Sequence, residues 1–314
     1  MENQIQTPHK RRVRYKGKYP KKFEEKYKEL QPEKYKDTIE HVIQKGNTPA
    51  GMHISIMVKE IIDFLNIQPG EIGFDATLGY GGHTKAMLKC LNGKGHIYAT
   101  DVDPEESAKT KKRLEEQGFG EKILTVCLQN FCTIDEIAEK VGGFDFILAD
   151  LGVSSMQIDN PKRGFSFKAD GPLDLRLNQE KGISAAERLD TISREELAGM
   201  LYENSDEPYC EELAKAITDE IRRGNRIDTT TKLRNVIEKT LSFLPDNKEK
   251  KDIVKKTCQR TFQALRIDVN NEFEVLYEFM EKLPDALRPG GRVAILTFHS
   301  GEDKLVKKAL KAGY

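Results

Sequence analysis

The segment that most constrains the fold of this chain is Asp75-Ala-Thr-Leu-Gly79-Tyr-Gly81-Gly82-His83. It follows a short apolar run, Ile72-Gly73-Phe74, of the kind that forms a buried parallel strand. It precedes apolar residues at helical spacing from Thr84 to Leu91. A strand, a glycine turn and a helix place backbone N–H groups at the positive end of a helix, where a nucleotide-like ligand approaches closely. The segment therefore predicts the first βα unit of an α/β domain.

An acidic residue closes the next apolar run, His96-Ile-Tyr-Ala-Thr-Asp101. Asp101 lies about 20 residues beyond the glycine turn, the spacing at which a carboxylate accepts hydrogen bonds from ribose hydroxyls. The turn and the acid together indicate an adenosine-containing cofactor.

Strand and helix patterns then alternate along the chain. Strands are predicted at residues 72–78, 96–102, 123–128 and 144–150, with helices between them. Such alternation is typical of a doubly wound, mainly parallel sheet. From about residue 156 to about 266 the pattern is polar and helical. Strand character returns at 291–298, after a helix expected from about 270 to 287.

The helical stretch is most simply explained as a domain inserted beyond the fourth strand. We expect a basic arm and linker at 1–51, a doubly wound α/β domain at 52–157 and 267–314, and an inserted helical domain at 158–266. An insertion there lies over the carboxyl ends of the strands, so it should cover the substrate. One short helix follows the last predicted strand. A seven-stranded sheet would need a further antiparallel pair, so either the chain is truncated or another element caps that edge.

Composition limits the class of protein. The chain has 314 residues, of which 38% are hydrophobic and 32% charged, as in a globular domain with a real core. No apolar run reaches the length of a membrane span, and the N-terminus lacks a signal-peptide core. The five cysteines show no metal-ligand spacing, so we expect reduced thiols, no bound metal and a cytoplasmic location.

The charge is uneven although its net value is zero. Residues 1–22 contain eight basic side chains, with two tyrosines among them, and one acid. Such an arm can neutralise phosphates and stack on unpaired bases. A solvated tail without a partner explains the charge run equally well.

The placement of the first acid narrows the identity of the cofactor. Asp75-x-Thr77-x-Gly79-x-Gly81 follows the acid-x-Gly-x-Gly-x-Gly layout of S-adenosylmethionine enzymes, with Thr77 at the first glycine position. The glycines would admit the methionine part of the cofactor, and the strand-end acid could orient its ammonium group. Phe131, after the third strand, could face the adenine, although an ordinary core aromatic explains it as well.

The fourth strand ends at Asp150-Leu-Gly-Val-Ser154. Amino-group methyltransferases carry an acid or amide here, which accepts a hydrogen bond from the amine that receives the methyl group. A structural or cofactor-facing carboxylate is an equal alternative for Asp150. Further on, Arg163-Gly-Phe-Ser-Phe167 could grip an extruded base and its phosphate, whereas Asp170-Gly-Pro-Leu-Asp-Leu-Arg176 could be a turn held by ion pairs. For His299, a structural role is favoured over that of a general base.

Taken together, these motifs resemble one family, the bacterial 16S rRNA (cytosine-N4) methyltransferases known as RsmH or MraW. The resemblance extends from about residue 53 to the end of the chain. The matching segments, in family order, are His53-Ile-Ser-Ile-Met, Asp75 to Thr84, Asp150 to Gln157, Arg163 to Phe167, Asp170 to Arg176, Arg260 to Ile267 and Phe298-His-Ser.

The resemblance implies a Rossmann-like methyltransferase with an inserted helical substrate domain. It implies N4-methylation of a cytosine in the decoding centre of the small ribosomal subunit, with S-adenosylmethionine as methyl donor and 16S rRNA as partner. The family's cofactor contacts fall on Gly81, Gly82, His83, Asp101, Phe131, Asp150 and Gln157. Asp150 is also the candidate catalytic residue.

The chain departs from the family pattern in several places. The additional arm and the changed motifs indicate a divergent paralogue, whereas the missing tail bears on the completeness of the sheet. The basic arm is additional, the family's arginine-rich tail is missing, and the family's His-Pro-Ala-Thr-Arg is Lys256-Thr-Cys-Gln-Arg260 here. Its Gly-Glu-Glu is Ser205-Asp206-Glu207.

Other functions remain open from the sequence. They are a methyltransferase that acts on another RNA or on DNA, and a ribosome-assembly factor that binds the cofactor without turnover. The lack of a Pro-Cys nucleophile argues against carbon-5 cytosine chemistry. The sequence does not fix the oligomeric state, and a homodimer remains open.

Overall fold

The computed structural model describes residues 55–312. The basic arm and linker predicted at 1–51 lie outside this range, as does His53 of the first matching segment. Across 55–312, no helix has both the length and the apolar character needed to cross a membrane.

The core of the fold is a five-stranded sheet in the order β3-β2-β1-β4-β5, in which all neighbouring strands are parallel. The strands are β1 (Ile72–Asp75), β2 (His96–Asp101), β3 (Leu124–Leu128), β4 (Phe144–Asp150) and β5 (Leu287–Leu296). The predicted doubly wound, Rossmann-like sheet is therefore confirmed. β1 is shorter than expected because the chain turns after Asp75, where the Leu78 N–H donates to the Thr100 carbonyl.

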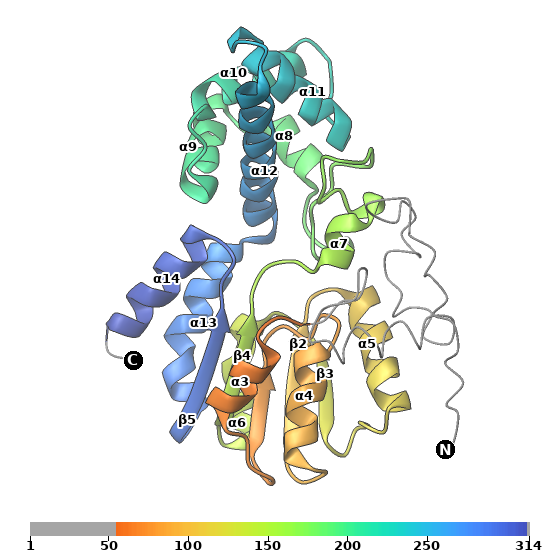
Figure 1. Cartoon of the computed structure of the whole chain (residues 1–314), viewed down its shortest axis with the longest axis vertical. Helices are drawn as coiled ribbons and strands as arrows, with labels where there is room; N and C mark the ends of the chain where they lie inside the picture. Colours follow the sequence, from red (N-terminus) through yellow and green to blue (C-terminus); the bar gives the residue numbers. More distant parts are fainter. Residues whose placement is uncertain (1–54, 313–314) are drawn as a thin grey trace, which may run out of the picture. The chain divides into compact units, whose positions relative to one another are not determined.

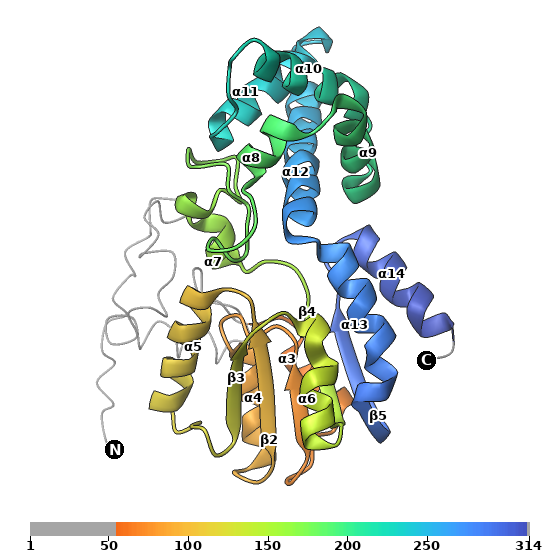
Figure 2. The ribbon, with the colours of Figure 1, turned by 180° about the vertical axis from the view of Figure 1, so that it is seen from behind.

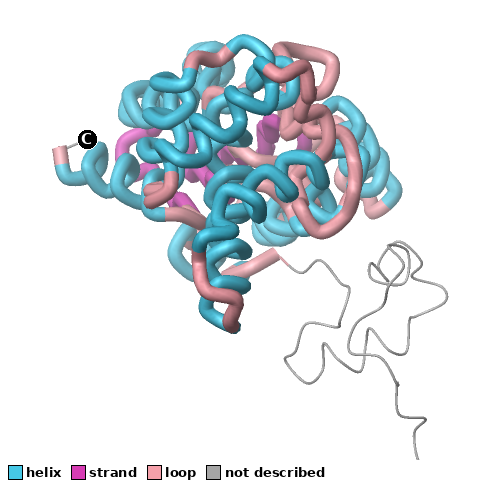
Figure 3. The backbone as a smooth tube through the Cα atoms, turned by 90° about the horizontal axis from the view of Figure 1, so that it is seen from above, coloured by secondary structure: helices cyan, strands magenta, loops and turns pink. Residues whose placement is uncertain are grey.

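Helices cover both faces of the sheet (Figures 1 and 2). Helices α3 (Val58–Leu65), α4 (Gly82–Leu91) and α5 (Pro104–Glu116) pack on one face. Helices α6 (Ile134–Val141), α13 (Glu272–Ala286) and α14 (Ser300–Lys311) pack on the other. Figure 3 shows the strands enclosed between these helices.

Strand β4 shows why both faces are covered. Its apolar residues alternate between the two layers: Phe146 and Leu148 join the core beneath α3 and α4, whereas Ile147 and Ala149 join the core beneath α6 and α13. A strand that is buried on both faces has a nearly continuous run of apolar residues, and the sequence of β4 has this pattern.

Between β4 and α13 the chain forms helices with a core of their own, separate from the two layers on the sheet. The elements are α7 (Ser155–Asp159), η3 (Pro161–Arg163), α8 (Ala185–Thr191), α9 (Arg194–Ser205), α10 (Cys210–Arg222), α11 (Thr230–Thr240), η4 (Leu241–Phe243) and α12 (Lys248–Asn270). A separate core supports the division into 52–157 plus 267–314 and an insert at 158–266, which we retain as a proposal.

Two element boundaries differ from the sequence prediction. The helix expected from about 270 begins at Glu272, because Asn271 takes a left-handed conformation with φ of 48° and separates it from α12. Strand β5 begins at Leu287 rather than at residue 291. The pairing of β5 with β4 is irregular here: Phe144 pairs with Leu287, but Phe146 pairs with Arg292. The residues Pro289-Gly290-Gly291 therefore bulge out of the pairing, and Gly290 has φ of 80°.

Candidate functional site

The glycine turn after β1 is held together by Asp75. This side chain is 1% exposed. Its Oδ1 accepts the Thr77 N–H at 3.1 Å and its Oδ2 accepts the Thr84 hydroxyl at 2.6 Å. Burial raises the pKa of Asp75, although the hydrogen bonds from Thr84 and Thr77 oppose this effect. Both carboxylate oxygens thus hold the glycine turn together, and the interpretation that Asp75 orients the cofactor's ammonium group stays a prediction.

Gly81 and Gly82 form the start of α4. Gly81 has φ of 75°, and a Cβ atom at this position would lie 2.8 Å from the Thr110 methyl carbon. A Cβ atom on Gly82 would collide with the Ser55 hydroxyl. The N-cap residue, Gly81, contributes no side-chain hydrogen bond to the helix. The first N–H groups of α4 and the positive end of its dipole are thus available to a ligand.

Asp101 lies beside this turn at the end of β2. Its Oδ2 accepts the Gly79 N–H at 2.8 Å, and its Oδ1 accepts the Asp103 N–H at 2.9 Å. Burial raises the pKa of Asp101 to about 6, although the hydrogen bonds from Asp103 and Gly79 oppose it. Each carboxylate oxygen keeps a second lone pair with which to accept a hydroxyl. The structure therefore brings the predicted ribose-binding acid next to the glycine turn.

His83 and Asp150 meet between the ends of α4 and β4. His83 is 6% exposed, and its Nε2 donates to the Ile56 carbonyl at 2.8 Å. Its Nδ1 lies 3.4 Å from Asp150 Oδ2. Burial disfavours the imidazolium, but the interactions with Asp150 and the Ile56 carbonyl outweigh it and raise the pKa of His83.

Asp150 has one unused oxygen. Its backbone N–H donates to the Thr77 hydroxyl at 2.8 Å, which ties the end of β4 to the glycine turn. Its Oδ1 is buried and has no hydrogen-bond partner among residues 55–312. A buried acceptor without a donor is costly, so it indicates a position where a ligand N–H group completes the site.

Gln157 also lies near the glycine turn, to which it is linked through a hydrogen bond to Asp103. It forms a capping box with Ser154 at the start of α7, and its Nε2 donates to Asp103 Oδ2 at 3.2 Å. Asp103 also caps α5 by accepting the N–H groups of Glu105 and Glu106. Sequence analysis missed Asp103, although an aspartate directly before Pro104 is a typical helix-start signal.

Arg163 provides the fourth contact to Asp103. Its Nη1 donates to Asp103 Oδ2 at 2.7 Å, and both side chains are buried, with exposed fractions of 6% and 2%. Phe165 is buried in the core of the insert, and Phe167 packs edge-to-face against Phe262. The interpretation that this segment grips a base and its phosphate is therefore wrong. The segment instead attaches the start of the insert to α5.

Leu128 ends the neighbouring strand β3, and Phe131 follows it at the start of η2 (Phe131–Thr133). Phe131 is partly buried and packs edge-to-face against Phe279 of α13, with ring centroids 5.1 Å apart. Leu128 pairs in register with Asp101 and is 53% exposed. Because register partners on adjacent parallel strands share a face, Leu128 offers an apolar surface next to Asp101. Its exposure was not evident from the sequence, since it lies within an apolar run.

The remaining sequence candidates are held in ion pairs. Arg176 contacts both oxygens of Asp174 at 2.8 Å. The segment from Asp170 to Arg176 is therefore a turn held by an ion pair, which was one of the alternatives. Arg266 contacts both oxygens of Glu272 at 2.8 Å at the junction of α12 and α13.

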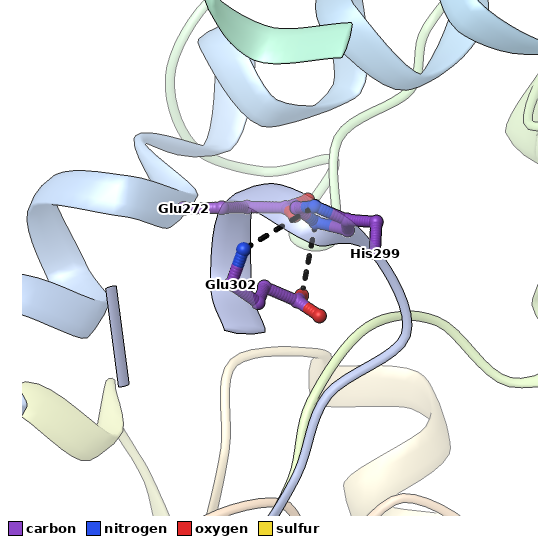
Figure 4. A group of neighbouring side chains, drawn as sticks. All are labelled: Glu272, His299 and Glu302. Carbon is purple, nitrogen blue, oxygen red and sulfur yellow. Dashed lines mark hydrogen bonds and ion pairs between the residues drawn. The ribbon is translucent and has the colours of Figure 1, made fainter. Parts of the chain in front are cut away.

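His299 has a structural position (Figure 4). Its Nδ1 accepts the Glu302 N–H at the start of α14, and its Nε2 lies 3.2 Å from Glu302 Oε1. Glu272 lies beside them, and the three side chains have the spacing of a metal-ligand group. Arg266 already supplies a positive charge to Glu272, however, and Glu302 Oε2 accepts the Phe298 N–H at 2.8 Å. The structural interpretation of His299 is confirmed.

Comparison with known proteins finds relatives from one family of methyltransferases. The model of the MraW methylase family matches residues 50–313. The chain is 85% identical over 306 residues to Ribosomal RNA small subunit methyltransferase H 1 from Agathobacter rectalis, covering 98% of this chain and 87% of that protein. It is 71% identical over 310 residues to the protein of the same name from Lachnoclostridium phytofermentans, covering 99% and 84%. It is 37% identical over 261 residues to Ribosomal RNA small subunit methyltransferase H from Clostridioides difficile, covering 82% and 81%.

Proposed function

The chain belongs to the MraW methylase family and is a methyltransferase that uses S-adenosylmethionine, and from this premise we propose that it methylates N4 of a cytosine in 16S rRNA. Three relatives that match most of this chain are named for the RNA of the small ribosomal subunit. One structural observation carries the proposal further: the unpaired Oδ1 of Asp150 lies at the end of β4, beside the glycine turn.

The side chains around the turn fit the cofactor. Asp101 would accept hydrogen bonds from the ribose hydroxyls, and Gly81 and Gly82 would let the cofactor approach the start of α4. Leu128 and Phe131 would offer apolar contact to the adenine, and His83, Asp150 and Gln157 would complete the family's contact set. The bound cofactor supplies a methyl group on a positively charged sulfur.

Asp150 would act on the acceptor amine. The exocyclic N4 of cytosine carries two hydrogens, and its lone pair is delocalised into the ring. A carboxylate oxygen that accepts one N–H holds the amine in place and favours charge development on nitrogen as the N–C bond forms. His83 orients the other oxygen of Asp150, which leaves Oδ1 for this contact. Oδ1 could serve the cofactor's ammonium group instead, and the variant below distinguishes the two roles.

The test is methyl transfer from labelled S-adenosylmethionine to 30S subunits and to naked 16S rRNA, with nucleosides identified by mass spectrometry. We expect N4-methylcytidine from at least one substrate. Asp150→Asn should lower kcat by about 100-fold, the lower range of effects seen for lost proton-transfer and charge-stabilising groups, while cofactor affinity changes little. Asp285→Asn is the control, because Asp285 is exposed on α13.

Four outcomes would change the proposal. Absence of N4-methylcytidine from both substrates contradicts it. A methyl group on a different nucleoside favours the alternative of another RNA site, and cofactor binding without turnover favours an assembly factor. A cofactor affinity that falls as much as kcat in Asp150→Asn assigns Asp150 to the cofactor. A cytoplasmic location and a homodimer remain untested predictions.

A further inference from the structure

We propose that the ring of Phe298 is the surface on which the target base stacks while Asp150 holds its amine. The inference rests on the proposed function, because it assumes that a nucleobase enters the site. It assigns a substrate-binding role to a residue that sequence analysis noted only as part of the Phe298-His299-Ser300 segment.

Phe298 is exposed where its neighbours are not. Phe298 is 56% exposed, whereas residues 291–297, which lead up to it, are partly buried. The ring therefore presents an apolar face that no described residue covers.

The position of Phe298 places it at the acceptor site. Strands β4 and β5 pair so that Asp150 lies opposite Leu296, and the Leu151 N–H donates to the Leu296 carbonyl at 3.1 Å. Phe298 and Gly152 each follow that register pair by two residues. A Cβ atom on Gly152 would lie 3.6 Å from Phe298 Cδ2, so the ring lies against the turn that Asp150 begins.

Hydrogen bonds hold the backbone of Phe298 in place. Figure 4 shows two of the neighbouring side chains, His299 and Glu302. The Phe298 N–H donates to Oε2 of Glu302, a side chain that is only 4% exposed. Glu302 in turn contacts His299, whose ring packs edge-to-face against Phe273 with centroids 5.7 Å apart. A buried carboxylate is expensive, and here it fixes the backbone beneath an exposed aromatic ring.

This arrangement suits an extruded base. Enzymes that modify a base commonly take it out of its stack and compensate by stacking it on an aromatic side chain while its edge is read by polar groups. Phe298 would supply the face contact from the end of β5, and Asp150 would supply the edge contact from the end of β4. The two strand ends would thereby set both the plane and the amine position of the base.

The test compares Phe298→Leu, which keeps an apolar side chain but removes the ring, with Phe298→Tyr, which keeps the ring. The substrate is the RNA that the wild-type protein methylates. We expect Phe298→Leu to lower kcat/KM for RNA by roughly 5- to 100-fold, the range that loss of one base–aromatic stack produces. Phe298→Tyr should stay within about threefold of wild type, since a tyrosine ring stacks equally well. Cofactor affinity by calorimetry should be unchanged in both.

Phe64→Leu is the matched control, because Phe64 is 60% exposed on α3, outside the insert. It should leave kcat/KM unaltered. Wild-type kcat/KM in Phe298→Leu would overturn the inference, as would an equal loss in Phe298→Tyr. A parallel loss of cofactor affinity would also overturn it, because that pattern indicates disturbed structure. Failure of the wild-type protein to methylate any RNA is a different result, which overturns the proposed function itself.

Discussion

The carboxylate of Asp101 shows how a single residue couples cofactor binding to pH. It accepts two backbone N–H groups, and burial raises its pKa to about 6. Its proposed role of accepting two ribose hydroxyls requires the ionised form. Protonation turns one oxygen into a donor and removes one of those contacts.

We therefore predict that affinity for S-adenosylmethionine falls as the pH drops through about 6. Asp101 is ionised at pH 7.5 and mostly protonated at pH 5.0, so the Kd from calorimetry should rise about tenfold between these values. The Asp101→Asn variant should bind S-adenosylmethionine weakly, and its Kd should not show the tenfold rise that comes from protonation of Asp101. His83 has its pKa raised above its usual value and stays in both proteins, so it cannot produce the difference. Equal pH profiles for the two proteins would contradict the assignment.

Individual residues differed in how far the sequence could place them. Asp101 and Asp150 were recognised because each ends a strand, and parallel strands end at one edge of the sheet. Arg163 was misread because its partner, Asp103, lies 60 residues away in sequence. No local pattern shows whether an arginine is exposed to a ligand or buried in such a pair.

At the scale of elements, helix α4 offers a test of the glycine turn. Gly81 precedes this helix with φ of 75°, and Gly93 follows it with φ of 74°. A Cβ atom would meet Thr110 at Gly81 but nothing within 4 Å at Gly93. Thr110 cannot easily turn away, because its hydroxyl donates to the Gly79 carbonyl at 2.7 Å.

Gly81→Ala should accordingly destabilise the protein more than Gly93→Ala does. Both variants carry the strain of a left-handed alanine, about 1–2 kcal/mol. Only Gly81→Ala adds overpacking, which costs about 1–3 kcal/mol more. Urea unfolding measures the difference, and calorimetry should show weakened cofactor binding for Gly81→Ala alone. Equal unfolding free energies would mean that the turn accommodates a side chain.

Elements with a strong local pattern were predicted best. The bounds of β4 agree with the predicted range of 144–150, because glycines flank its apolar run. The start of β5 was predicted at residue 291 instead of Leu287, because Pro289 and the two glycines after it are typical of a turn. Pairing with β4, together with the contact of Arg288 Nη1 to Asp145 at 2.8 Å, holds that segment in the sheet.

At the scale of the whole molecule, the pair of Arg163 and Asp103 joins the insert to the sheet domain. Arg163→Met would leave the Asp103 carboxylate buried without its cation. We expect the unfolding free energy to fall by about 3–5 kcal/mol, as for other buried pairs that lose one partner. Adding Asp103→Asn should restore part of the loss, because asparagine still caps α5 and carries no charge.

Arg226→Met is the control for that experiment. Arg226 contacts Asp190 at 2.8 Å, but both side chains are substantially exposed, at 53% and 30%. Removing such a surface pair should change the unfolding free energy by less than about 1 kcal/mol. If both arginine variants lose the same stability in urea unfolding, Asp103 and Arg163 do not join the two parts as described.

The fold class and the existence of an insert could be predicted because they follow from the order of strand and helix patterns. What the sequence could not show is how the insert is fastened. Gln157, Arg163 and Asn270 make contacts to residues 54 to 95 positions away. Such contacts depend on the assembled fold, which periodicity does not report.

The placement of the insert between β4 and β5 also has a consequence for synthesis. Asp145 and its partner Arg288 are 143 residues apart in sequence. At about 5–20 residues per second, β4 emerges from the ribosome roughly 7–30 seconds before β5 can pair with it. During that interval a strand made almost entirely of apolar residues has an open edge. Until β5 has been synthesised, the nascent chain is thus exposed to aggregation through this edge.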